Sequence, residues 1–93
     1  MEHLHYVVET DKIELKENKR DDDIEFIITY QSPEVHHAIH QIRQFFESDD
    51  YYTDILFYTF KDYVQIIVKR DSYLTFILGL FKWNLLSKVE WKE

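Results

Sequence analysis

Apolar and polar residues alternate along much of this 93-residue chain, which is the pattern of half-buried β-strands. The alternation is clear in HLHYVVE and KIELKE near the N-terminus and in IEFIITY, which begins at Ile24. It returns in ILFYTF and YVQIIVK, on either side of Lys61 and Asp62. These stretches predict five strands, and the closing KVEWKE predicts a short sixth one.

Residues 32–46, SPEVHHAIHQIRQFF, have a helical period instead. Apolar residues recur there at spacings of three or four, namely at Val35, Ile39, Ile42 and Phe46. This spacing predicts an amphipathic helix of about four turns that packs on the sheet. Ser32 and Pro33 are residues that suit the start of such a helix.

A second helix is predicted for YLTFILGLFKWNLL, which begins at Tyr73, although these residues also favour strands. One apolar stripe is expected to face the core and consists of Leu74, Ile77, Leu78, Phe81 and Leu85. The opposite side is also apolar, with Tyr73, Phe76, Leu80 and Trp83, and has Lys82 at its rim. A small domain has little core for two apolar helix faces, so this second face predicts a protein interface. The alternative is that the N-terminal hairpin covers it.

The order of the elements predicts an α+β fold in one domain, residues 1–93. An N-terminal β-hairpin extension (1–17) would precede a ferredoxin-like β-α-β-β-α-β sandwich (24–93), in which two helices cover one face of an antiparallel sheet.

Gly79 is the only glycine, Pro33 the only proline, and there is no cysteine. Glycine-rich phosphate loops, disulfides, thiolate nucleophiles and cysteine zinc sites are therefore excluded. The N-terminus does not resemble a signal peptide, and the apolar run 73–81 is about half of what a membrane span requires. We therefore expect a cytoplasmic protein with no cofactor, no catalytic residues and no membrane partner.

The net charge of −7 is concentrated in residues 1–60, which hold fourteen Asp and Glu against five Lys and Arg. An acidic surface repels phosphate, so direct nucleic-acid binding is not expected. The segment KDYVQIIV lies where sheet-based RNA-binding modules have their recognition motif, but Asp62, Val64 and Gln65 replace its glycines and an aromatic residue.

Three of the five histidines, His36, His37 and His40, lie in the first predicted helix. His36 and His40 are four residues apart and with Glu47 form a weak candidate metal site. Arg43 lies between them, and its positive charge opposes a bound cation. A partly exposed polar helix flank explains the histidines without a metal.

Three functions follow from these patterns. We expect first a small, acidic, non-enzymatic protein-interaction domain that binds a protein partner or itself, as a homodimer. The second is an acidic inhibitor, antitoxin or immunity-type protein that occupies a basic, nucleic-acid-binding site on its partner. Its carboxylates would be Glu17, Asp21, Asp22, Asp23, Asp49, Asp50 and Asp54. The third is a histidine-based metal or pH sensor.

Overall fold

The computed structural model describes residues 3–48 and 55–92 and has an α+β fold with two sheets and two helices. In chain order, the elements are β1 (His3–Val8), β2 (Ile13–Lys19), β3 (Asp23–Tyr30), α1 (Glu34–Glu47), β4 (Ile55–Thr59), β5 (Tyr63–Lys69), α2 (Tyr73–Lys82) and β6 (Leu86–Lys92). A short 3₁₀ turn, Arg70–Ser72, leads into α2.

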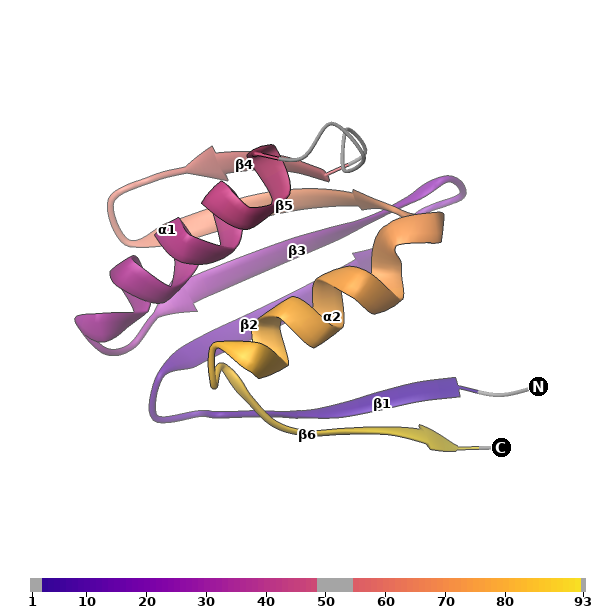
Figure 1. Ribbon diagram of the computed structural model, residues 1–93, viewed down its shortest axis with the longest axis horizontal. Coiled ribbons are helices and arrows are strands. Elements are labelled where there is room, and N and C mark those ends of the chain that lie inside the picture. The colour runs from indigo at the N-terminus through magenta and orange to yellow at the C-terminus, as the bar shows by residue number, and fades with distance from the viewer. Residues whose placement is uncertain (1–2, 49–54, 93) are drawn as a thin grey trace.

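The larger sheet has four antiparallel strands in the order β2-β3-β5-β4. Helices α1 and α2 lie side by side on the same face of this sheet (Figure 1). The alternation of the central strands places their most apolar residues under the helices, where Phe26, Ile28, Val64 and Ile66 are fully buried. The core is therefore a single layer between the sheet and the two helices.

Helix α1 buries the stripe that its sequence predicts: Val35, Ile39, Ile42 and Phe46, with Ala38 beside them. Its start differs from the expectation, because no side chain caps the backbone there. The Ser32 hydroxyl instead donates a hydrogen bond to the Glu34 carboxylate.

The strand order differs from the ferredoxin-like one. In that fold the last strand, here β6, would lie beside β3, but β2 takes this place and pairs from Ile13 with Tyr30 to Lys19 with Ile24. A hairpin that closes over a few residues costs less chain entropy than pairing with a strand some sixty residues later. The predicted hairpin of residues 1–17 does not form, because β1 pairs with β6 and not with β2.

Strands β1 and β6 form a separate antiparallel ribbon, in which His3 is opposite Lys92 and Val8 is opposite Leu86. The ribbon runs along the β2 and α2 side of the molecule and brings both ends of the chain to one place (Figure 1). Its inward side chains, Leu4, Tyr6, Val8 and Val89, pack against the core.

Candidate functional site

Helix α2 turns a different face to the sheet from the one expected. Phe76 and Leu80, predicted as interface residues, are 0 % exposed, and the Phe76 ring centroid lies 4.8 Å from that of Phe26. Ile77 and Leu85 are buried as predicted. Both sides of α2 are apolar, so the period could not tell which one packs; the space above Phe26 and Phe46 takes the aromatic side chain.

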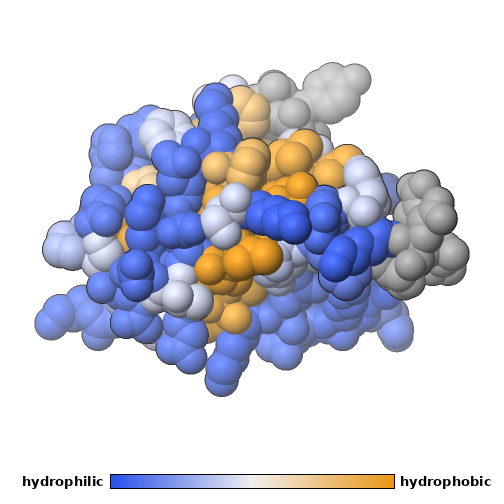
Figure 2. All heavy atoms as spheres, turned by 90° about the horizontal axis from the view of Figure 1, so that it is seen from below, coloured by the Kyte–Doolittle hydropathy of each residue, from blue (hydrophilic) through white to orange (hydrophobic). Residues whose placement is uncertain are grey.

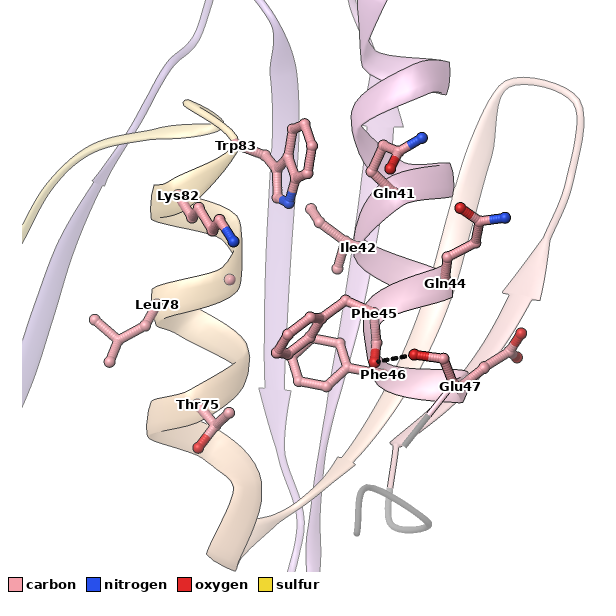
Figure 3. Close-up of a pocket in the computed structure, with 12 residues that line it drawn as sticks. Gln41, Ile42, Gln44, Phe45, Phe46, Glu47, Thr75, Leu78, Lys82 and Trp83 are labelled. Carbon is pink, nitrogen blue, oxygen red and sulfur yellow. Dashed lines mark hydrogen bonds between the residues drawn. The ribbon is translucent and has the colours of Figure 1, made fainter. Parts of the chain in front are cut away.

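The surface of α2 is therefore formed by residues that were expected in the core. Leu74, Leu78 and Phe81 are 39 %, 47 % and 43 % exposed, and we call these three residues the α2 ridge. Leu78 points away from α1 (Figure 3). On the side of the molecule that carries the β1–β6 ribbon, a hydrophobic area lies in the middle of the surface and is bordered by hydrophilic side chains (Figure 2).

A groove of about 800 Å³ separates α2 from α1. Its walls include the side chains of Ile42, Phe45, Phe46, Leu78, Lys82 and Trp83. Figure 3 shows the aromatic rings between the two helices, with the indole nitrogen of Trp83 and the ammonium of Lys82 directed towards the space between them. Apolar walls with a few polar groups are typical of binding sites.

Gly79 lies where the two helices approach each other closely. A Cβ atom at position 79 would lie 3.3 Å from Cε2 of Phe46, which is closer than most Cβ atoms come to a neighbouring side chain. Glycine thus lets the ring of Phe46 pack directly against the backbone of α2. The lone glycine inside an apolar run was the sequence signal for this close approach.

Two further interface candidates, Tyr73 and Trp83, are partly buried. The Tyr73 hydroxyl donates a hydrogen bond of 2.9 Å to Oε1 of Glu17, and the Tyr6 hydroxyl donates one of 2.6 Å to the same atom. Burial first, and then the hydrogen bond to Glu17, raise the pKa of both Tyr6 and Tyr73. Both phenols are therefore neutral donors at neutral pH. We call Tyr6, Tyr73 and Glu17 together the Glu17 clamp.

Three of the other carboxylates of the acidic-surface hypothesis lie together between the end of β2 and the start of β3. Asp21 and Asp22 are exposed in the turn between β2 and β3, and Asp23 is half-buried at the start of β3. Asp49, Asp50 and Asp54 lie outside the described residues. Glu17 is held by the two tyrosines, so it is not a free surface charge.

Glu25, on the uncovered face of the sheet, has its own set of partners. Hydrogen bonds from Gln65 (2.6 Å) and Asn18 (3.1 Å) lower the pKa of its carboxyl group, and Arg20 lies 3.2 Å away. This carboxylate is a bound acceptor and remains ionised.

The histidines of α1 are exposed and point to different neighbours. The His36 ring centroid lies 4.3 Å from that of Tyr30, and that of His37 lies 6.4 Å from that of Trp83. Glu47, the third candidate ligand, accepts a 3.0 Å hydrogen bond from Nε of Arg43. Residues 3–48 and 55–92 contain no group of three or more His, Asp or Glu side chains that could hold a metal ion.

The uncovered face of the sheet carries exposed Leu56, Tyr58 and Tyr63, with Phe60 stacked on Tyr63 at 4.6 Å. The central strand β3 presents Glu25 and Ile27 on this face, without an aromatic residue. An RNA-recognition sheet stacks bases on aromatics of its central strands, and β3 supplies none.

Comparison of the chain with protein-family models, with curated proteins and with solved structures found no match. Neither helix within the described residues is long and apolar enough to cross a membrane.

Proposed function

We propose that this protein is a non-enzymatic protein-interaction domain that forms a homodimer through the α2 ridge. The observation that carries the proposal is the exposure of Leu74, Leu78 and Phe81 on one side of a single helix. A contiguous apolar surface rimmed by polar side chains is typical of an interaction site. The ridge replaces the interface first expected on the other side of α2, where Phe76 and Leu80 serve the core.

Charge favours a second copy of the chain as the partner. The chain as a whole carries −7, and two such surfaces repel each other. Helices α1 and α2 together carry two acidic residues, Glu34 and Glu47, and two basic ones, Arg43 and Lys82. Two copies that meet through their helices therefore avoid the repulsion that contact through the remaining surface entails.

The size of the ridge sets the strength of the proposed contact. A ten-residue helix is only about 15 Å long, whereas each partner in a stable interface buries about 800 Å². The ridge by itself falls short of that area. We therefore expect a dimer that dissociates on dilution.

Sedimentation equilibrium over a range of protein concentrations tests this proposal. The average mass of the wild type should rise from the monomer towards twice that value. Leu78→Glu should remain monomeric, because it places a charge in the centre of the contact. Leu56→Glu is the matched control: Leu56 is 49 % exposed, close to the 47 % of Leu78, but lies on the uncovered face of the sheet. It should dimerise like the wild type.

Two outcomes contradict the proposal. A wild type that stays monomeric at the highest concentration removes the homodimer. If Leu56→Glu abolishes association and Leu78→Glu does not, the interface lies on the sheet and not on α2.

A further inference from the structure

The groove between α1 and α2 holds two hydrogen-bond donors without acceptors among the described residues. Lys82 forms no ion pair there, and the indole N–H of Trp83 donates no hydrogen bond. Both donors are directed into the space between the helices (Figure 3). They come from neighbouring residues at the end of α2, so they can serve one acceptor group.

The surface of the groove is mainly apolar, with Gln41, Gln44, Ser48 and Thr75 as further polar residues. Phe45, Phe46 and Ile42 line the α1 side, and Thr75, Leu78 and Gly79 line the α2 side. From Lys82 back to Thr75 the helix rises by about 10 Å, the length of an alkyl chain of roughly eight carbons. A volume of about 800 Å³ lies within the range of small-molecule sites.

We infer that this groove binds a medium-chain alkyl carboxylate, with its head on Lys82 and Trp83 and its tail along Phe46 towards Thr75. The ammonium of Lys82 and the indole N–H of Trp83 would each bind one carboxylate oxygen. Charge selects an anionic head, because Glu47, the one carboxylate among the described residues that line the groove, is already paired with Arg43 at 3.0 Å.

The end of α2 does not oppose an anion as strongly as a free helix C-terminus does. Three of its last carbonyl groups accept backbone hydrogen bonds. Trp83 N–H binds the oxygen of Gly79, Asn84 N–H that of Phe81, and Leu85 N–H that of Leu80, at 3.0 to 3.3 Å. With these oxygens occupied and Lys82 in the last turn, the local charge is positive.

Lys82 can reach such a head without losing a strong contact. Its Nζ lies 5.8 Å from the ring centroid of Phe45, a cation–π contact worth about 0.5–1 kcal/mol at an exposed site. A charge-assisted hydrogen bond to a carboxylate is stronger than that. The inference does not require the proposed dimer, because the head group binds Lys82 and Trp83, which are not part of the α2 ridge; Leu78 belongs to both the ridge and the wall of the groove.

Trp83 reports on the groove directly. In the Trp91→Phe variant, Trp83 is the only tryptophan, and its emission can be followed during titration with sodium decanoate below the micelle concentration. We expect a saturable change, and no such change with decyltrimethylammonium, which has the same tail and the opposite charge. Lys82→Gln in that background should weaken decanoate binding roughly tenfold or more. Lys69→Gln, an exposed lysine on β5, removes the same charge elsewhere and should leave binding unchanged.

Charge reversal keeps the test decisive if one variant is poorly folded. Lys82→Glu, with its fold checked by circular dichroism, should shift the preference from decanoate to decyltrimethylammonium. A signal that does not saturate, equal responses to both amphiphiles, or unchanged decanoate binding in Lys82→Gln would each overturn the inference.

Discussion

The double substitution Tyr6→Phe/Tyr73→Phe removes both hydrogen bonds to Glu17 and leaves the packing of the two rings in place. A fully buried hydrogen bond to a charged group contributes about 1.5–3 kcal/mol, and solvent access to these half-buried groups reduces that contribution. Each single substitution should therefore lower the free energy of unfolding by about 1 kcal/mol. A domain of this length has roughly 5–14 kcal/mol in total, so the effect is readily measured.

The double substitution should cost more than the two single ones together. After one phenol is lost, the other still donates to Oε1 of Glu17. After both are lost, a carboxylate whose side chain is only 14 % exposed has no donor from either tyrosine. We expect a total loss of about 3 kcal/mol, with the excess reported by the double-mutant cycle.

Urea unfolding followed by tryptophan fluorescence measures these values. Tyr58→Phe is the matched control, because Tyr58 is exposed and its hydroxyl has no hydrogen bond to a described residue. It should leave the stability unchanged. If Tyr6→Phe and Tyr73→Phe have the same free energy of unfolding as this control, the hydrogen bonds to Glu17 do not stabilise the fold.

Alkaline pH provides a second readout of the same groups. The pKa of Tyr6 and Tyr73 is raised above the ordinary value of 10.0, so the folded protein holds these protons more tightly than the unfolded chain. Their stabilisation is complete below pH 10 and is lost as the pH rises above it, by at most about 1.4 kcal/mol per pH unit for each tyrosine. Solvent screening reduces this slope. The double variant should lose this fall in stability above pH 10, and Tyr58→Phe should keep it.

Five further substitutions test the packing around α2. Phe76→Ala should lower the free energy of unfolding by about 3–5 kcal/mol, because the side chain is buried, and Leu78→Ala by less than about 1 kcal/mol, because the side chain is exposed. If urea unfolding gave the reverse ranking, the face of α2 with Leu78 would pack on the sheet. Gly79→Ala should lower the free energy of unfolding by about 1 kcal/mol, because the new Cβ meets the closely packed ring of Phe46. This loss outweighs the better helix propensity of alanine. A higher melting temperature would contradict the prediction. Asn84 follows α2 with φ of 63°, so Asn84→Gly should be neutral or slightly stabilising in thermal unfolding, and Asn84→Val should cost about 1–2 kcal/mol.

The sequence was most informative where one face of an element is polar. Helix α1 has a single apolar stripe, and Val35, Ile39 and Phe46 are buried as its period predicts. The start of helix α2 at Tyr73 was predicted, but the helix ends at Lys82 and not at Leu86, and because it is apolar on both sides its rotation about its own axis could not be predicted. The choice between Phe76 and Leu78 for the core depends on the shape of the space above Phe26, which only the folded sheet defines.

The order of the strands in the sheet could not be predicted from the alternation of apolar and polar residues. Alternation shows that β2 and β6 are strands with one inward side, but either could lie beside β3. The sequence did contain one sign of the Glu17 clamp, because Glu17 occupies an inward position of β2, in phase with Ile13 and Leu15. A carboxylate at such a position requires donors in the fold.

The β1–β6 ribbon determines when this chain can finish folding. Its pairs join residues as far apart as His3 and Lys92, so the ribbon closes a longer loop than any pairing in the four-stranded sheet. The β2–β3 hairpin and the β4–β5 hairpin join near neighbours and can form much earlier. During synthesis, β1 emerges before β6 and has to wait for it, and Leu4 and Tyr6 have no place in the core until β6 arrives. Until β6 has been synthesised, β1 is therefore an unpaired apolar strand.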